Sequence, residues 1–345
     1  RTGPGVAYDG LPKFNLEQFD TSYFQRLHDR VRAAAHMGIY VSIMLFESWG
    51  LRRVSDAWKM HPFHPANNIQ QLSLNPNLQG PEIQTLAFPR VTAIQETYVR
   101  KVIDTVNDMD NVLFEITNEG DLSTTDWQYH MIRTIKQYEA DKPKQHPVGM
   151  TTIGFDVDDS ERLYRSSAEW ISPSHSERFT YRVDPPANTG KKIILLDTDH
   201  LWGIGGNVAW VWKSFLRGHQ PLYMDPYEGQ IHPLPSQEEC EAMRRALGET
   251  RRWAEKVNLA AMTPCDELAS TGYCLADPGR EYLIFQPGHG DFGVDLVAGT
   301  YRCEWYSPSS GTVKKGMVKA RGGDQAFTPP VSGEIVLYLK ATPYR

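Results

Sequence analysis

The segment NVLFEITNEGD, residues 111–121, brings an amide and a carboxylate, Asn118 and Glu119, to the end of an apolar run. If the run is a β-strand, Glu119 lies at the end of the strand, where burial would raise the pKa of its carboxyl group. A carboxyl group of this kind can protonate the leaving oxygen when a glycosidic bond is cleaved. Asn118 could hydrogen-bond a sugar hydroxyl. The alternative is a solvated turn, because Asn, Gly and Asp favour turns.

A second carboxylate is required for this chemistry, and the segment IILLDTDHLWG, residues 193–203, offers two. Asp197 and Asp199 are two residues apart and therefore lie on one face of a strand. We favour Asp197 as the nucleophile, or as the base of an inverting enzyme, with Asp199 as the alternative. Asp199 would serve equally well as a helix N-cap or in a structural ion pair.

Other polar and aromatic residues follow apolar runs and would surround the same site. Together with Asn118, the predicted sugar-binding residues are Glu47, Trp49, His175, His200, Trp202 and Asp225. Neither a cofactor nor a metal ion is predicted. The alternative is a metal-dependent hydrolase that uses His61 and His64 of HPFHPANN with Asp197, Asp199 and His200, but no H-x-H pair occurs on an early strand.

Alternating helix-like and strand-like segments between residues 22 and 258 would position these side chains. Helical periodicity predicts helices over 22–38, 89–108, 124–140, 206–218 and 238–257, and apolar runs predict strands over 39–50, 111–117, 146–154, 168–176, 191–203 and 221–229. Residues 51–88 are predicted to form a long loop. Polar residues at the ends of parallel strands are typical of a (β/α)8 barrel. A doubly wound sheet shows the same alternation, but the chain contains no G-x-G-x-x-G loop.

The pattern changes near residue 262, where short strands separated by Gly, Pro and Ser turns begin. This pattern predicts a small all-β sandwich. We therefore expect a barrel domain over residues 1–262 and a sandwich domain over residues 263–345.

The composition excludes several other classes of protein. The net charge is −6 and the basic residues are scattered, which argues against a nucleic-acid partner. No stretch of eighteen apolar residues is present, so no membrane span is expected. The four cysteines lack zinc-site spacing, although Cys265 and Cys274 could pair. The opening RTGPGVAYDG has neither an initiator Met nor a leader-like segment, so we expect a mature or partial chain.

Several segments resemble a known family. Asn118-Glu119 after an apolar strand resembles the acid/base signature at the end of strand four in clan A glycoside hydrolases. YFQRLHDRVRAAAHMGIYVSIMLF resembles the helix-strand unit of the apiosidase-like (DUF4038-type) barrel. GYCLADPGREYLIF, CEWYSPSSG and GEIVLYL resemble the collagen-binding-type domain that follows such barrels. Together these segments extend over nearly the whole chain.

The resemblance implies a secreted or periplasmic enzyme that cleaves poly- or oligosaccharides. Two departures are evident. The clan has Glu at the end of strand seven, where this chain has Asp197, and only six strand units are visible, so the first two strands are missing. A preceding chain portion, self-association or a partner segment would then cover the open barrel edges. The alternative function is a non-catalytic carbohydrate-binding protein on a degenerate or truncated barrel.

Overall fold

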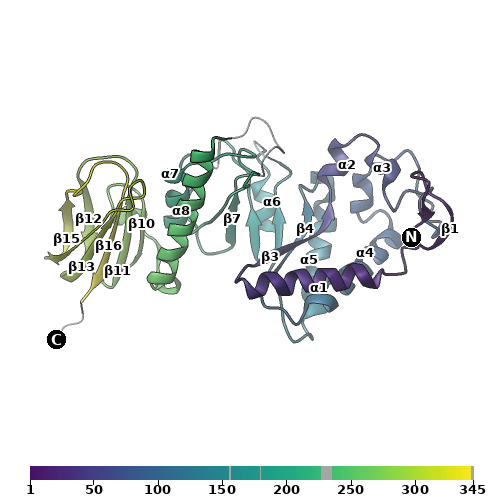
Figure 1. Ribbon diagram of the computed structural model, residues 1–345, viewed down its shortest axis with the longest axis horizontal. Coiled ribbons are helices and arrows are strands. Elements are labelled where there is room, and N and C mark those ends of the chain that lie inside the picture. Colours follow the sequence, from purple (N-terminus) through teal and green to yellow (C-terminus); the bar gives the residue numbers. More distant parts are fainter. Residues whose placement is uncertain (155–156, 179, 227–234, 343–345) are drawn as a thin grey trace. The chain divides into compact units, whose positions relative to one another are not determined.

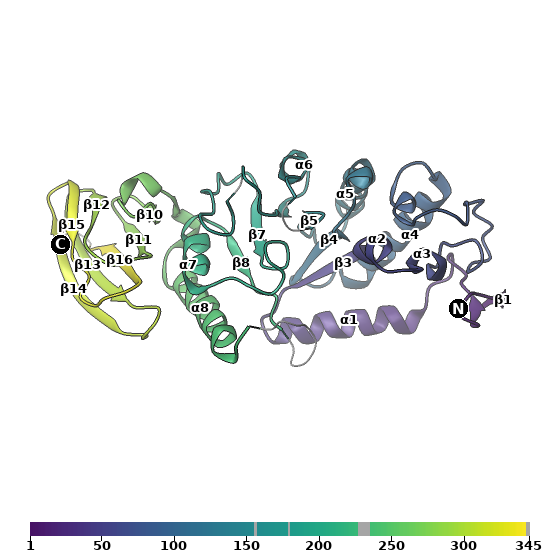
Figure 2. The ribbon, with the colours of Figure 1, turned by 90° about the horizontal axis from the view of Figure 1, so that it is seen from above.

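The computed structural model describes residues 1–154, 157–178, 180–226 and 235–342, and it contains two compact units. The first unit comprises residues 1–154 and 159–172, and the second comprises residues 155–158 and 173–345. Figures 1 and 2 show the helices and strands of each unit from two directions.

A parallel sheet forms the centre of the first unit. Its strands, in spatial order, are β3 (Val41–Glu47), β4 (Val112–Asn118), β5 (Val148–Thr151) and β6 (Trp170–Ser172). Its longer helices are α1 (Thr21–His36), α4 (Pro89–Val106) and α5 (Thr125–Glu139), and α6 (Ser160–Arg165) precedes β6. Helix α1 packs against α4, and α4 packs against α5 (Figure 1). All these strands and the three long helices were predicted, whereas the short α6 was not.

Local sequence signals explain where these elements begin and end. The Asp20 side chain caps α1 by accepting a hydrogen bond from the backbone N–H of Ser22 at 2.9 Å. Pro89 is near the start of α4, where a backbone N–H would have no intrahelical acceptor, so the missing N–H of proline costs no hydrogen bond. In β4 the alternate residues Val112, Phe114 and Ile116 are at most 1% exposed. The strand is therefore a core element, and it carries its polar end, Asn118, to the edge of that core.

The region predicted as a long loop contains short helices. These are α2 (Trp49–Arg53), α3 (Ala57–Met60) and the 3₁₀ turn η1 (Pro81–Gln84). They are too short for a helical periodicity to be read from the sequence. The other short elements of this unit are β1 (Gly3–Val6), β2 (Pro12–Lys13) and the 3₁₀ turn η2 (Leu122–Thr124).

The second unit begins with two parallel strands, β7 (Ile193–Asp197) and β8 (Gln220–Leu222), and two helices, α7 (Val208–Leu216) and α8 (Gln237–Lys256). Ser236 and Glu239 form a reciprocal capping box at the start of α8. The described residues of the two units contain six parallel strands rather than the eight of a complete barrel, and the barrel is not closed.

Antiparallel strands form the rest of the second unit. A six-stranded sheet has the order β14 (Val313–Ala320), β13 (Gly299–Tyr306), β16 (Ile335–Ala341), β11 (Glu281–Gln286), β10 (Cys274–Asp277) and β9 (Thr263–Pro264). Strands β12 (Phe292–Leu296) and β15 (Gly323–Phe327) form a second sheet. The 3₁₀ turns η3 (Leu259–Ala261) and η4 (Asp266–Leu268) lie beside β9.

Two hydrophobic cores hold the layers of this second unit together. One core joins the two antiparallel sheets and includes Phe292, Tyr282 and Leu337. The other core lies between the six-stranded sheet and the helices, and includes Trp212 of α7 and Trp253 of α8. The domain boundary proposed near residue 262 thus falls where the chain passes from helices to strands, although both parts share a core.

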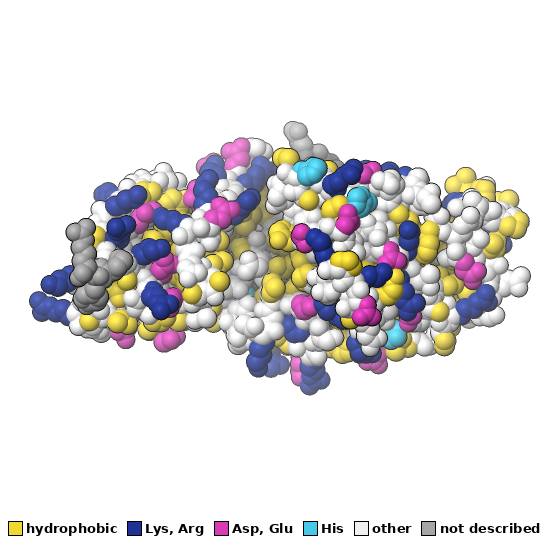
Figure 3. All heavy atoms as spheres, turned by 90° about the horizontal axis from the view of Figure 1, so that it is seen from below, with side chains coloured by type: hydrophobic (Ala, Val, Ile, Leu, Met, Phe, Trp, Pro, Cys, Tyr) yellow, Lys and Arg dark blue, Asp and Glu magenta, His cyan; other side chains and the backbone are white. Residues whose placement is uncertain are grey.

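The structure also bears on the sequence predictions about membrane spans, surface charge and cysteines. No helix among the described residues is long and apolar enough to cross a membrane. On the face shown in Figure 3, Lys and Arg side chains are mixed with Asp and Glu. All four cysteines are free thiols, so Cys265 and Cys274 do not form a disulfide.

Candidate active-site residues

The ends of β3 and β4 bring three predicted site residues together in the first unit. Glu47 and Asn118 are register partners, and Asn118 Nδ2 donates a hydrogen bond to Glu47 Oε2 at 3.2 Å. The other oxygen of Glu47 accepts the backbone N–H of Gly50 at 2.6 Å. Trp49 begins α2 and remains 44% exposed. The two strand ends therefore present a carboxylate, an amide and an accessible indole.

Glu119 follows directly after β4 and has an unusual backbone conformation. Its φ is +44°, in the left-handed region that side chains other than Gly, Asn and Asp rarely adopt. The residue is only 9% exposed. Arg52 of α2 contacts it twice, since Nη2 donates to the Glu119 carbonyl oxygen at 2.8 Å and to Oε2 at 3.2 Å. Glu119 thus lies in a turn directly after the strand, and it is buried there rather than solvated.

Gly120 lies where a side chain would force its neighbours to move. A Cβ at this position would overlap Nε2 of the buried Gln128 and would lie 2.7 Å from Cγ2 of Thr117. The Gly120 carbonyl oxygen accepts a hydrogen bond from Arg162 Nη2 at 3.3 Å, and Arg162 is itself paired with Asp159 at 2.8 Å. Two arginines on different helices therefore hold consecutive carbonyl groups behind the candidate acid.

The end of β7 presents the second group of candidates, in the second unit. Asp197 is the last residue of the strand, and its Oδ1 accepts the backbone N–H of Asp199 at 3.0 Å. Burial and the neighbouring Asp197 raise the pKa of Asp199, although His200 acts in the opposite direction. His200 is 5% exposed. Thr198 accepts the Met224 N–H at 2.8 Å and so links the turn to the segment after β8.

The remaining predicted binding residues of this unit have identifiable structural partners. Trp202 packs edge-on against Trp210 with ring centroids 5.4 Å apart. His175 accepts the backbone N–H of Arg182 through Nδ1 at 3.5 Å. Asp225 accepts two hydrogen bonds from Arg244 of α8, at 2.8 and 2.6 Å, and this pairing lowers the pKa of Asp225. Asp225 is therefore already engaged in the structure.

Arg52 and Arg162 were not among the predicted site residues. Arg52 lies 67 positions before Glu119 and 101 positions before Ile153, whose carbonyl oxygen it also contacts at 3.0 Å. Its only sequence signal is its place shortly after a predicted strand. Arg162 lies on the short helix α6, for which no periodicity was recognised.

The histidines of the alternative metal site are engaged with backbone groups. His61 Nδ1 and His64 Nδ1 accept the N–H groups of Phe63 and Ala66, both at 3.1 Å. Burial lowers the pKa of His61 to about 4. Over the described ranges, no group of three or more His, Cys, Asp or Glu side chains has an arrangement that could hold a metal ion.

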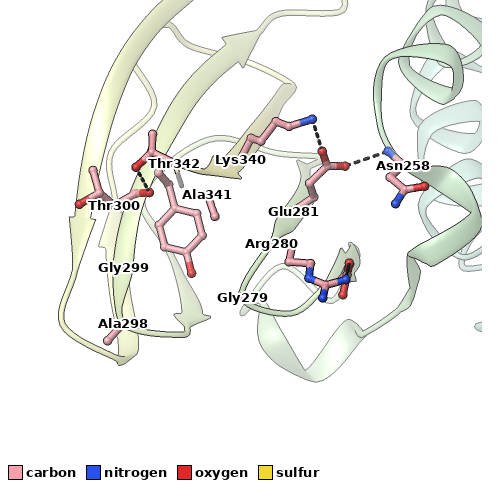
Figure 4. A pocket seen from close by; sticks show the side chains of 12 residues that line it. Asn258, Gly279, Arg280, Glu281, Ala298, Gly299, Thr300, Lys340, Ala341 and Thr342 are labelled. Carbon is pink, nitrogen blue, oxygen red and sulfur yellow. Dashed lines mark hydrogen bonds and ion pairs between the residues drawn. The ribbon is translucent and has the colours of Figure 1, made fainter. Parts of the chain in front are cut away.

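A separate cavity of about 440 Å³ lies in the antiparallel part of the second unit (Figure 4). Its charged groups are paired: Glu281 binds Lys340 at 2.5 Å and the Asn258 N–H at 2.8 Å, and Arg280 lies 3.5 Å from Asp277. None of the predicted site residues lines it. We therefore assign it no part in the candidate site.

Comparison with known sequences gives a family match for the first half of the chain. Residues 1–172 match the family model of a domain of unknown function, DUF6298, and the match ends at the last residue of the first unit. No sequence among the curated proteins matches the chain. Residues 1–172 are thus similar to DUF6298, and the resemblance to apiosidase-like and collagen-binding-type domains remains a prediction.

Three solved structures resemble nearly the whole chain. A glycoside hydrolase has a TM-score of 0.59 at 11% identity, over 99% of this chain and 84% of its own. A family 5 glycoside hydrolase from Bacteroides vulgatus has a TM-score of 0.60 at 12% identity, over 97% and 79%. A protein from the same organism, described as a glycoside hydrolase without established activity, has a TM-score of 0.60 at 11% identity, over 97% of this chain and 66% of its own. The chain therefore has a glycoside-hydrolase-like, TIM-barrel-like fold.

Proposed function

We propose that the protein is a glycoside hydrolase that cleaves a poly- or oligosaccharide with two carboxyl groups. One observation carries the proposal: Glu119 follows Asn118 at the end of a parallel strand and is held there, in a left-handed conformation, by Arg52. The glycoside-hydrolase-like fold supports it, because parallel-barrel enzymes place their catalytic groups at the carboxyl ends of strands.

Glu119 would act as the general acid and base. As an acid it gives a proton to the glycosidic oxygen, so that the leaving sugar departs as an alcohol. In a retaining enzyme the second carboxylate attacks the anomeric carbon as the sugar leaves, and Glu119 then accepts a proton from the water that displaces this carboxylate. In an inverting enzyme water attacks the anomeric carbon directly, and the second carboxylate accepts its proton. Asn118, which lies beside it and also contacts Glu47, would bind a sugar hydroxyl.

Asp197 would supply the second carboxylate, with Asp199 as the alternative. Asp197 ends β7, whereas the raised pKa of Asp199 favours its neutral form. An Asp side chain is one methylene shorter than Glu. A retaining enzyme requires carboxyl groups about 5–5.5 Å apart, whereas an inverting enzyme requires roughly 6.5–9.5 Å. The anomeric configuration of the first product, measured by NMR, distinguishes these two mechanisms.

The other predicted residues would contribute to substrate binding. They are Glu47, Trp49, His175, His200, Trp202 and Asp225, of which Asp225 must exchange its contact with Arg244 to do so. The antiparallel part from residue 263 would be an accessory module. Secretion or a periplasmic location is expected for an enzyme that acts on polysaccharides.

The test is hydrolysis of a panel of plant and microbial polysaccharides, measured as reducing ends released. We expect Glu119→Gln to abolish cleavage of substrates with poor leaving groups. Of Asp197→Asn and Asp199→Asn, the variant that lacks the second catalytic acid should also abolish cleavage. Glu161→Gln, an exposed acid on α6, is the control. Unchanged turnover in Glu119→Gln would remove Glu119 from the mechanism. Sugar binding without turnover by the unmodified protein would support the carbohydrate-binding alternative.

A further inference from the structure

Arg52 connects three strand ends of the first unit through a single nitrogen atom. Its Nη2 contacts the Glu119 carbonyl oxygen at 2.8 Å, Glu119 Oε2 at 3.2 Å and the Ile153 carbonyl oxygen at 3.0 Å. Arg52 itself follows β3, Glu119 follows β4, and Ile153 lies just beyond β5. The guanidinium therefore fixes the backbone of the candidate acid and its carboxyl group at the same time.

Burial strengthens this contact. The side chains of Arg52 and Glu119 are only 13% and 11% exposed. Charges shielded from water in this way interact more strongly than a surface pair does. An arginine keeps its charge at every pH at which proteins are folded. The contact therefore favours the ionised carboxylate of Glu119 and restrains the carboxyl group through Oε2.

We propose that Arg52 is a positioning residue for Glu119, which fixes the orientation of its carboxyl group and sets the pH at which that group releases its proton. As an account of catalysis this rests on the proposed function. As a statement about Glu119 it is measurable without any substrate. Arginine is suited to this role because its planar guanidinium holds Nη2 in a fixed direction, whereas a lysine ammonium is a compact charge on a flexible stem.

Other charged groups lie near this corner of the unit. Arg162 contacts the Gly120 carbonyl oxygen, but its charge is balanced by Asp159 at 2.8 Å. Glu47 of β3 faces Asn118, and Glu115 lies further back on β4. Asp121 accepts hydrogen bonds from Ser123 at 2.9 and 2.7 Å. Apart from the Arg162–Asp159 pair, the groups named are the acids Glu47, Glu115 and Asp121, so loss of the Arg52 charge would leave Glu119 in more acidic surroundings.

The experiment is a titration of the Glu119 carboxyl carbon by ¹³C NMR, with the signal assigned by its loss in Glu119→Gln. In Arg52→Met and Arg52→Gln we expect the midpoint to rise by about one pH unit, because an adjacent opposite charge typically lowers a carboxyl pKa by about one to three units. Arg52→Lys retains the charge and should shift the midpoint less. Arg53→Met, an exposed neighbour on the same helix, is the control and should leave it unchanged.

Kinetics give a second readout if the protein hydrolyses glycosides. The alkaline limb of kcat/KM should move to higher pH by the same amount in the neutral variants, because the acid then stays protonated at higher pH. Arg52→Lys should keep the limb near its original pH but lose about tenfold in kcat, with KM within about twofold, because the fixed orientation is lost.

The outcomes separate this inference from the proposed function. A folded Arg52→Met or Arg52→Gln variant with an unchanged Glu119 midpoint overturns the role of Arg52. A shifted midpoint in a protein that cleaves no glycoside supports the role of Arg52 and refutes the hydrolase proposal. If both neutral variants fail to fold, Arg52→Lys decides: unaltered kcat would contradict the positioning role.

Discussion

The left-handed conformation of Glu119 gives a direct prediction for stability. Both Glu119→Gly and Glu119→Ala remove the carboxyl group and its contact with Arg52, so the difference between them depends mainly on the backbone. At φ +44° a Cβ costs about 1–2 kcal/mol, and glycine avoids this cost. Glycine has more conformational freedom to lose on folding, which offsets roughly 0.5–1 kcal/mol of this gain. We expect the Gly variant to be more stable than the Ala variant by about 1 kcal/mol.

The assay is urea denaturation followed by circular dichroism and tryptophan fluorescence, with the free energy of unfolding compared at equal m-values. Asn118 provides the matched control, because it is the last residue of β4 and has no positive φ. There, Asn118→Ala should be more stable than Asn118→Gly by about 0.5–1 kcal/mol. An Ala variant at position 119 that is as stable as the Gly variant would refute the reasoning, because it would show that the backbone is not strained.

Three further predictions concern other positions. Gly120→Ala should destabilise the protein by about 1–3 kcal/mol, because its Cβ would overlap Gln128 and Thr117. Gly248→Ala on α8 is the control and should not destabilise it, because a Cβ there has nothing within 4 Å, and equal urea midpoints of the two variants would contradict the prediction. Asp199→Asn should stabilise the protein at pH 7 and leave it unchanged near pH 3, because burial and Asp197 raise the pKa of Asp199 and its charged form is therefore disfavoured in the folded state. Burial alone would lower the pKa of His146, but Glu139 and the Met109 carbonyl raise it. The stability that His146 contributes below about pH 6.5 should therefore be lost as the pH rises through its folded-state pKa, and His146→Gln should flatten this dependence in urea titrations from pH 5 to 9.

The sequence predicted the parallel strands and the long helices because each has a local pattern. The run before Asn118 is apolar, and its alternate residues Val112, Phe114 and Ile116 do form the core. Asp197 was expected at the end of an apolar run and is the last residue of β7. Periodicity and strand ends are properties of neighbouring residues, so they can be read without knowledge of the fold.

The contacts around the candidate acid could not be predicted in the same way. Arg52 approaches Glu119 only because β3 and β4 are neighbours in the sheet, and nothing in the sequence near residue 52 indicates that pairing. The left-handed φ of Glu119 also has no local signal, since Glu is not a residue that favours it. The common core of α7, α8 and the antiparallel sheet depends on tertiary packing, which the change of pattern near residue 262 did not reveal.

Three unfavourable features coincide at this one strand end, and their coincidence argues for function. Glu119 occupies a conformation that glycine would adopt without strain, a Cβ at Gly120 would overlap Gln128 and Thr117, and Nε of the largely buried Arg52 has no hydrogen-bond partner among the described residues. A sequence selected only for stability would place Gly or Asn at position 119 and would not bury an arginine there. Strain that the surrounding structure maintains is characteristic of sites where a side chain must be held in a fixed place. We infer that the carboxyl group of Glu119 is retained for its chemistry, and the comparison of Gly and Ala at this position measures what its placement costs.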